Sequence, residues 1–223
     1  MSRELWTEVD RYVADLLMPS DPVLEAALKA STRAGLPEIA VSPPQGMLLH
    51  LLAKSLGAQR ILEVGTLGGY STIWLARALP ADGKLVTLEM DPKHAEVARG
   101  NLEHAGLAER VEVRVGPAAE TLPKLANEGH RFDFVFIDAD KVGYPRYFDW
   151  ALALSHRGTV IVADNVVRDG EVKDARSKDA SVQAVRTLLE KIAAQPRVKA
   201  TVMQIVGSKG YDGFAIVLVT ADA

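Results

Sequence analysis

Apolar residues recur along this chain with two different spacings. Near the amino end they return every three to four positions from Leu5 to Leu17, which predicts an amphipathic helix. The sequence SDP at positions 20–22 supplies a cap and a first turn for a second helix that runs to about Ala34. The run MLLHLLAKSLG, residues 47–57, predicts a third helix. The amino-terminal quarter is therefore expected to be helical.

From Arg60 onward the spacing changes to short continuous apolar runs. They are RILEVG (60–65), KLVTLEM (84–90), VEVRVG (111–116), FDFVFID (132–138) and GTVIVAD (158–164). Helical patterns alternate with most of them: STIWLARALP (71–80), DPKHAEVARGNLEHAG (91–106) and YFDWALALSHRG (147–158). Continuous apolar strands that alternate with helices indicate a parallel sheet covered on both faces.

The last two apolar runs, KATVMQIV (199–206) and DGFAIVLVT (212–220), are separated by a glycine-containing loop and not by a helix. This arrangement predicts a closing antiparallel hairpin. We therefore expect an α/β fold: a Rossmann-like, doubly wound, mostly parallel seven-stranded sheet with a C-terminal antiparallel hairpin and extra N-terminal helices. A single domain is predicted, with N-terminal helices over 1–57 and a cofactor-binding α/β core over 58–223.

Charge and composition narrow the function classes. Lysine plus arginine number 26 against 29 aspartates plus glutamates, so the net charge is −3 and no global basic field favours nucleic acid or an anionic membrane. The absence of cysteine excludes disulfides, thiolate metal sites and a cysteine nucleophile. No segment has the length and apolarity of a signal peptide or a membrane span. A cytoplasmic protein without membrane or nucleic-acid partners is expected.

The first strand leads into the glycine-rich sequence EVGTLGGYST, residues 63–72. Its glycines allow a backbone to approach a ligand closely, and Glu89, at the end of the next strand, can accept hydrogen bonds from ribose hydroxyls. The loop reads G-x-x-G-G and not the G-x-G-x-x-G of dinucleotide sites, and no arginine or lysine lies near it before Arg77. A cofactor without phosphates, such as S-adenosylmethionine, fits better than a dinucleotide. The alternative is that the glycines only form a tight turn.

Acidic side chains follow two further strands. Asp138 closes the run FDFVFID, and Asp164 and Asn165 follow GTVIVAD. If the two strands are neighbours, about 4.8 Å apart, three oxygen donors converge at one edge of the sheet. Oxygen-only ligation suits a hard cation, either Mg²⁺, Mn²⁺ or Ca²⁺. Lys141 is close enough in sequence to serve as a general base beside that cation. Taken singly, each acid could instead cap a helix or a turn.

The motifs EVGTLGGYST, TLEMDP, VFIDADK and VADNVVRDG, in this order and spacing, resemble the cation-dependent S-adenosylmethionine O-methyltransferases of the catechol and caffeoyl-CoA type, especially their bacterial members. The similarity extends from about Val41 to the end of the chain and includes the loop VSPPQG. The chain departs from the family pattern at Pro117, where an aspartate is frequent, and at Gly143, where an asparagine is frequent. It also has no clear counterpart of an additional substrate-binding acid, for which Glu171 and Asp174 are candidates by proximity only.

The resemblance implies roles for individual residues, a small aromatic hydroxyl substrate and a homodimer. The implied cofactor-binding residues are Val41, Gly65, Thr66, Ser71, Glu89, Met90, Ala118 and Asp138. The implied metal ligands are Asp138, Asp164 and Asn165, and Lys141 takes the position of the catalytic base beside Asp138.

Three other functions remain as alternatives at this stage. An RNA or nucleoside methyltransferase on the same scaffold would need a basic surface, which Arg168, Lys173, Arg176 and Lys178 could form. A nicotinamide-dependent dehydrogenase would share the sheet and Glu89 but would lack its phosphate loop. A cofactor-binding protein without turnover would keep the glycine loop, but the intact set around Asp138 argues against it. The amino-terminal apolar stripe either covers the core or packs on a second subunit.

Overall fold

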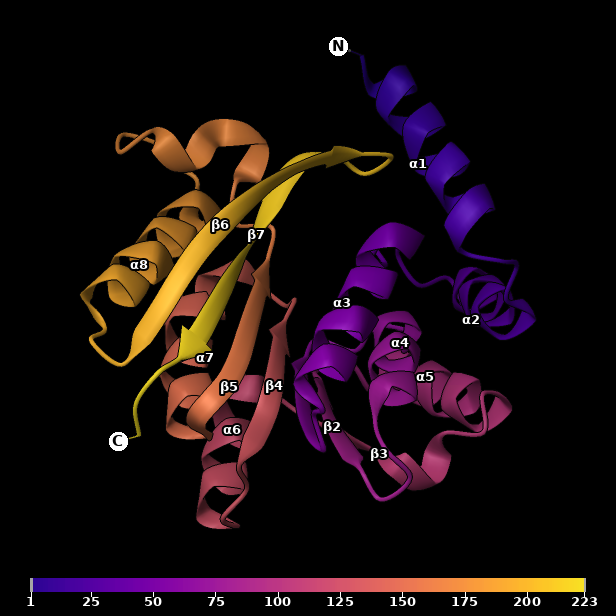
Figure 1. Cartoon of the computed structure of the whole chain (residues 1–223), viewed down its shortest axis with the longest axis horizontal. Helices are drawn as coiled ribbons and strands as arrows, with labels where there is room; N and C mark the ends of the chain where they lie inside the picture. Colours follow the sequence, from indigo (N-terminus) through magenta and orange to yellow (C-terminus); the bar gives the residue numbers. More distant parts are fainter. Residues whose placement is uncertain (1, 223) are drawn as a thin grey trace.

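The computed structural model describes residues 2–222 (Figure 1). The helices are α1 (Arg3–Leu17), α2 (Pro22–Arg33), α3 (Pro43–Leu56), α4 (Tyr70–Ala78), α5 (Pro92–His104), α6 (Ala118–Asn127), α7 (Tyr144–Ala153) and α8 (Ala180–Ala194). The strands are β1 (Arg60–Val64), β2 (Lys84–Glu89), β3 (Val111–Val115), β4 (Phe132–Ile137), β5 (Ser155–Asp164), β6 (Val198–Gly207) and β7 (Gly210–Val219). Short 3-10 turns are η1 (Ala108–Arg110), η2 (Lys141–Gly143) and η3 (Arg168–Lys173).

The strands form one seven-stranded sheet in the order β3-β2-β1-β4-β5-β7-β6. The first five strands along the chain pair in parallel, whereas β7 pairs antiparallel with both β5 and β6. The predicted doubly wound sheet with a closing antiparallel hairpin is confirmed. The chain order reverses between β1 and β4, so the ligand crevice of such a sheet is expected at the carboxyl ends of these two strands.

Helices cover both faces of the sheet (Figure 1). Alternate strand residues face opposite layers: Leu62 and Val64 of β1 pack with α6, α7 and α8, whereas Ile61 packs with α2, α3 and α4. Both layers are apolar and nearly free of solvent, which explains why the central strands read as continuous hydrophobic runs.

The amino-terminal helix α1 does not cover the core. None of its residues is buried, and it touches the tip of the β6–β7 hairpin, where Asp10 Oδ2 accepts a hydrogen bond from the backbone N–H of Ser208 at 2.8 Å. The interpretation that its apolar stripe covers the core is therefore wrong. The other interpretation, a second subunit, stays a prediction.

Several element boundaries differ from those expected. The helix predicted over 147–158 ends at Ala153, and β5 begins at Ser155, before the predicted start at Gly158. Helix α3 begins at Pro43 because Ser42 caps it and two prolines fit its first turn. Helices α6 and α8 were not among the predicted ones. No helix within residues 2–222 is long and apolar enough to cross a membrane.

Candidate functional site

The predicted acidic residues meet at the carboxyl edge of the sheet. Strands β4 and β5 are neighbours with Ile137 opposite Ala163, so Asp138 and Asp164 follow at corresponding positions of adjacent strands. Strand neighbours lie about 4.8 Å apart, which places the two residues side by side. The predicted cation site required that these two strands be neighbours, and they are.

Asp164 is almost completely buried, with 3% of its surface exposed. Its Oδ2 accepts a hydrogen bond from Nε2 of Gln45 at 2.6 Å, and its Oδ1 accepts one from the backbone N–H of Asn165 at 2.8 Å. Burial, followed by the negative charge of Asp138, raises the pKa of Asp164 above its ordinary value. A cation at this edge would favour the ionised form of Asp164.

Asn165 adopts a left-handed backbone conformation with φ of 56°, which asparagine tolerates better than most residues. It turns the chain sharply out of β5. Among the described residues, no group of three His, Cys, Asp or Glu side chains is arranged to hold a metal ion. The donor set therefore fits a cation only as two carboxylates plus the amide oxygen of Asn165. Such oxygen-only sets, completed by water or substrate, are usual for Mg²⁺.

Lys141 lies directly beside this acidic pair. Its Nζ donates hydrogen bonds to Oδ1 of Asp138 at 3.0 Å, to the carbonyl of Ala139 at 3.1 Å and to the hydroxyl of Tyr144 at 2.7 Å. Only 11% of its side chain is exposed. An ammonium has three N–H groups, and in this geometry each of them has an acceptor.

The glycine loop that follows β1 packs against the same edge. Gly65 has a φ of 100°, and a Cβ at this position would collide with the backbone carbonyl of Asp138. At Gly68 a Cβ would collide with the hydroxyl of Ser31. These two glycines are therefore required by the close approach of the protein's own atoms. The loop brings the expected cofactor site into contact with the expected cation site.

Glu89 at the end of β2 holds the glycine loop in place. Its Oε2 accepts hydrogen bonds from the backbone N–H groups of Thr66 at 3.2 Å and Leu67 at 2.8 Å, and its Oε1 accepts one from Asp91 at 3.0 Å. A carboxylate offers about four acceptor directions, so one remains on Oε1. We predicted that Glu89 binds ribose hydroxyls. In this loop conformation Oε1 keeps an open acceptor direction for a ribose hydroxyl, beside Nδ1 of His94 at 3.7 Å.

Ser71, in the first turn of α4, points its hydroxyl inward. The hydroxyl donates to Oε1 of Glu63 at 2.6 Å, and Thr72 and Thr87 donate to Oε2 of the same carboxylate. Burial raises the pKa of Glu63 to about 7, although the three hydroxyl donors oppose this shift. While Glu63 is ionised, the single proton of Ser71 is engaged, so the hydroxyl can only accept a hydrogen bond from a ligand. It therefore suits an ammonium group better than a carboxylate.

The remaining predicted cofactor residues surround this loop in the fold. Val41 is buried just before α3, Thr66 is buried with its Oγ1 2.5 Å from that of Thr87, and Ala118 opens α6. Met90 is 72% exposed next to Glu89. All of them follow the carboxyl ends of β1, β2 or β3 except Val41. Their roles toward a cofactor stay predictions.

Three residues at this edge were missed by the sequence reasoning: Gln45, Glu63 and Tyr144. Glu63 could have been identified from the sequence, because it is an acidic residue within an apolar strand. Gln45 lies in the first turn of α3, within the sequence VSPPQG, but its partner Asp164 is 119 positions away. Tyr144 stands three positions after Lys141, a spacing typical of one helix face.

The surface residues considered for other functions do not gather into a site. Glu171 is exposed on η3, and exposed Asp174 pairs with Arg176, so both acids are solvated. Arg168 faces inward, with its Nη1 3.9 Å from Oδ2 of Asp212. Arg168 therefore does not contribute to the basic surface that an RNA methyltransferase would need.

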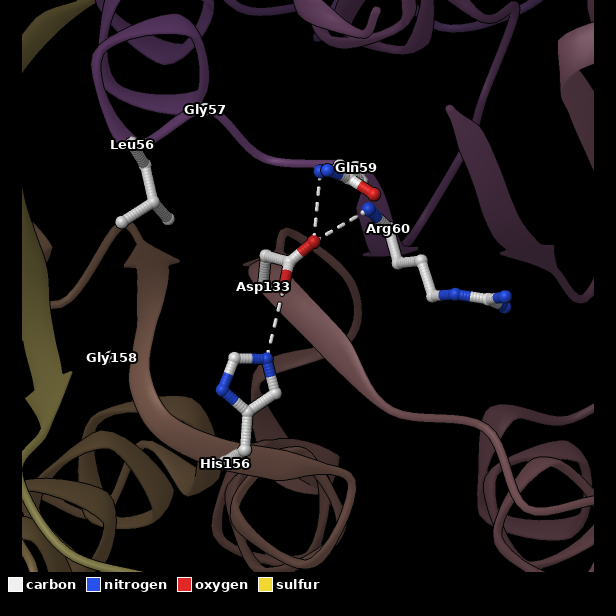
Figure 2. A pocket seen from close by; sticks show the side chains of 7 residues that line it. All are labelled: Leu56, Gly57, Gln59, Arg60, Asp133, His156 and Gly158. Carbon is white, nitrogen blue, oxygen red and sulfur yellow. Dashed lines mark hydrogen bonds and ion pairs between the residues drawn. The ribbon is translucent and has the colours of Figure 1, made fainter. Parts of the chain in front are cut away.

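A hollow of about 390 Å³ lies at the opposite edge of the sheet, where β1, β4 and β5 begin (Figure 2). Asp133 is at its centre and accepts hydrogen bonds from the backbone N–H groups of Gln59 and Arg60 and from Nε2 of His156 (Figure 2). The carboxylate of Asp133 is thus already hydrogen-bonded within the protein. This hollow is remote from the carboxyl edge that carries the predicted site.

Comparison with known proteins gives a consistent result. A sequence model of the O-methyltransferase family matches residues 16–218. A catechol O-methyltransferase of Mycobacterium tuberculosis is 55% identical over 212 residues, which cover 95% of each chain.

Two solved structures are similar over nearly their whole length. The O-methyltransferase of Bacillus cereus in complex with SAH has a TM-score of 0.97 and 56% identity, covering 98% of this chain and 100% of its own. TomG of Streptomyces achromogenes, an O-methyltransferase involved in tomaymycin synthesis and solved with SAM, has a TM-score of 0.96 and 52% identity, covering 99% and 100%.

Proposed function

The chain belongs to the O-methyltransferase family and is an S-adenosylmethionine-dependent O-methyltransferase; from this premise we propose that it methylates a hydroxyl of a small aromatic acceptor, of catechol or caffeoyl type, with the help of a divalent cation. The observation that carries the proposal is the meeting of Asp138, Asp164 and Lys141 beside the glycine loop. The 55% identity to a protein named as a catechol O-methyltransferase supports the acceptor class.

S-adenosylmethionine would be held by the loop between β1 and α4 and by the ends of the neighbouring strands. Glu89 would accept one ribose hydroxyl through the free direction of Oε1, and Ser71 would accept from the amino group of the methionyl tail. Val41, Gly65, Thr66, Met90 and Ala118 would line the same site, and Asp138 would border its methionyl end. The SAH and SAM in the two related structures support this assignment.

Asp138, Asp164 and Asn165 would ligate the cation, with Mg²⁺ favoured over Mn²⁺ or Ca²⁺. The cation, when bound, supplies positive charge that makes the acceptor hydroxyl more acidic and fixes its orientation. If Asp138 bound the cation through Oδ1, it would weaken its ion pair with Lys141, which uses the same oxygen. Ligation would thus free the direction of Nζ that now faces Asp138, and the lone pair of the neutral amine could use it toward the acceptor.

Lys141 would take the proton from the acceptor hydroxyl in its neutral amine form, which a bound cation nearby would favour over the ammonium. The hydroxyl oxygen forms a bond to the sulfonium methyl carbon as the bond between that carbon and sulfur breaks, and the proton stays on Nζ of Lys141. Proton removal of this kind contributes about 10²- to 10⁴-fold to a rate. Holding the two reactants in line supplies much of the remaining acceleration.

We also propose that the enzyme works as a homodimer in the cytoplasm, without membrane or nucleic-acid partners. The exposed apolar stripe of α1 supports the dimer. The net charge of −3 supports the absence of nucleic acid.

A methyl-transfer screen tests the proposal. The acceptors are catechols, caffeoyl esters, flavonoids and hydroxylated nucleosides, each with Mg²⁺ and with excess EDTA after removal of retained metal. We expect transfer to a catechol-type acceptor that EDTA abolishes. Asp164→Ala should lower this activity, and excess Mg²⁺ should restore part of it. Equal transfer in EDTA would refute the cation mechanism, and preference for a nucleoside would refute the acceptor class.

A further inference from the structure

Lys141 is held by fewer independent groups than its three hydrogen bonds suggest. Asp138 and Ala139 lie on the same short loop as Lys141 itself, so they move with it. The third partner, the hydroxyl of Tyr144, is also the nearest at 2.7 Å. It comes from the first residue of α7, a regular helix that packs on the sheet.

Tyr144 is itself completely buried, with no exposed surface. Its hydroxyl lies 3.1 Å from the carbonyl of Ile137, the last residue of β4, and 3.0 Å from the carbonyl of Asp164, the last residue of β5. A phenol has one proton to donate, which these two carbonyls share, and it accepts from Lys141 through a lone pair. One rigid ring thus connects the ends of both strands with Nζ of Lys141.

The aromatic ring of Tyr144 also makes a cation–π contact with the ammonium of Lys141, because Nζ lies 4.6 Å from the ring centroid. Lysine has four rotatable side-chain bonds, and its position is costly in entropy unless several contacts restrict it. The packing of Tyr144 in the core provides that restriction. Among the described residues, Nζ has no other hydrogen-bond or ion-pair partner outside residues 138–141.

We propose that Tyr144 is a positioning residue, which fixes Nζ of Lys141 at the edge of the sheet where Asp138 and Asp164 lie. It acts through Lys141 and does not touch the acceptor. This inference rests on the proposed role of Lys141 as the base. The competing explanation is that Tyr144 only satisfies the two strand-end carbonyls, which would make it a residue of structural stability.

A double-mutant cycle separates the two explanations. The variants are Tyr144→Phe, Lys141→Met and the pair, assayed with catechol, S-adenosylmethionine and Mg²⁺. Tyr144→Phe keeps the ring and removes the hydroxyl, so kcat should fall about tenfold, in the range of a lost hydrogen bond to a charged group. The KM values for both substrates should change by less than about twofold, because the hydroxyl contacts neither.

In the Lys141→Met background, the same Tyr144→Phe change should leave kcat unaltered, because there is no ammonium left to position. Its effect on the free energy of unfolding should persist in both backgrounds, because the two carbonyls lose their donor in each. Tyr147→Phe is the matched control: Tyr147 is on the same helix, and its hydroxyl binds Oδ1 of Asp140 and not Lys141. It should leave kcat unchanged in both backgrounds.

A second measurement needs no acceptor. Proton-detected ¹⁵N NMR of the lysine ammonium groups should show a slowly exchanging signal that disappears in Lys141→Met. Tyr144→Phe should shift and broaden that signal, and Tyr147→Phe should not.

The outcomes distinguish the inference from the proposed function. An equal loss of kcat from Tyr144→Phe in both backgrounds, or an unchanged signal and kcat in the single variant, overturns the positioning role alone. A wild-type kcat in Lys141→Met, or no turnover of catechol by the wild type, overturns the proposed base or acceptor, and the positioning role with it.

Discussion

Three of the about four acceptor directions of Glu89 are taken by backbone N–H groups, those of Thr66, Leu67 and Asp91. The fourth is the one that a ribose hydroxyl can use. Glu89 thus shapes the glycine loop and, in the proposed function, also binds the cofactor. Removal of its charge should affect both the loop and the affinity.

The first prediction concerns this carboxylate. Glu89→Gln should raise the dissociation constant of S-adenosylmethionine about 5- to 150-fold, as expected for loss of about 1 to 3 kcal/mol from charge-assisted hydrogen bonds. Isothermal titration calorimetry measures the constant. Glu112→Gln, a change at an exposed acid of β3, is the control and should bind normally. An unchanged constant in a folded Glu89→Gln variant would remove Glu89 from the site.

The second prediction concerns Gln45, whose amide donates to Oδ2 of the buried Asp164 at 2.6 Å. Gln45→Leu keeps the approximate size and removes the donor, so the carboxylate loses its orientation. Changes of this kind typically weaken metal binding about 10- to 100-fold. Titration of Mn²⁺ followed by electron paramagnetic resonance measures the effect. Gln183→Leu, remote on α8, should bind Mn²⁺ as the wild type does, and equal binding by Gln45→Leu would contradict the prediction.

Residues at the carboxyl edge of the sheet could be predicted from the sequence only where they end or directly follow a strand. Asp138, Asp164 and Glu89 each follow an apolar run, and the carboxyl ends of parallel strands share one edge. Gln45 could not be predicted in the same way, because its contact depends on how α3 docks against β5. The engagement of the Ser71 hydroxyl by Glu63 was missed for a similar reason, since it depends on the packing of α4 against β1.

At the scale of elements, hydrophobic runs located the strands more reliably than the helices. Helix α6 has the sequence AAETLPKLAN, in which Pro123 interrupts the pattern of a regular helix. The end of α7 was placed too late because the apolar sequence ALAL continues directly into β5. Periodicity cannot separate a helix from a strand when no glycine or proline divides them.

The start of β5 is tied to β4 by an ion pair at the edge remote from the site. Nε2 of His156 lies 2.9 Å from Oδ1 of Asp133, and its Nδ1 lies 2.9 Å from the carbonyl of Arg157 (Figure 2 shows the pair). Both partners can only accept, so the protonated imidazole, in which both ring nitrogens donate, is the form that this geometry favours. The carbonyl of Arg157 and then the carboxylate of Asp133 raise the pKa of His156 above 6.5.

The third prediction follows from the sign of this shift. Because the pKa is raised in the folded protein, the stabilisation is complete below the unfolded value of about 6.5 and is lost as pH rises through the folded value. The side chain is 43% exposed, so solvent should limit the effect to less than about 1 kcal/mol.

Urea unfolding at several pH values tests it. The difference in unfolding free energy between wild type and His156→Ala should be largest near pH 6 and should shrink toward pH 9. His104→Ala, a change at an exposed histidine without such partners, should show no comparable trend. A difference for His156→Ala that stays constant with pH would mean that the ring contributes packing and not charge.

At the scale of the whole molecule, the apolar surface is unevenly distributed. Helix α1 and the edge strand β6 lie in contact and are held together by polar groups, among them Arg3, whose guanidinium donates to the carbonyl of Ser208 at 3.1 Å. Both elements carry exposed apolar side chains: Leu5, Val9, Tyr12, Leu16 and Leu17 on α1, and Val202, Met203 and Val206 on β6. Apolar surface of this extent usually marks an interaction site, and an unpaired edge strand adds open backbone groups.

The last prediction is that this surface joins two copies of the chain. Sedimentation velocity of the wild type should give twice the mass of one chain at micromolar concentration. Tyr12, 67% exposed on α1, would be covered in such a dimer, and Tyr12→Asp would then bury an unpaired carboxylate, which costs several kcal/mol. Association should weaken at least about tenfold. Val115→Asp, at an exposed position on the opposite edge strand β3, should leave the mass unchanged. A monomeric wild type, or equal masses for the wild type and Tyr12→Asp, would show that α1 and β6 do not form the contact between subunits.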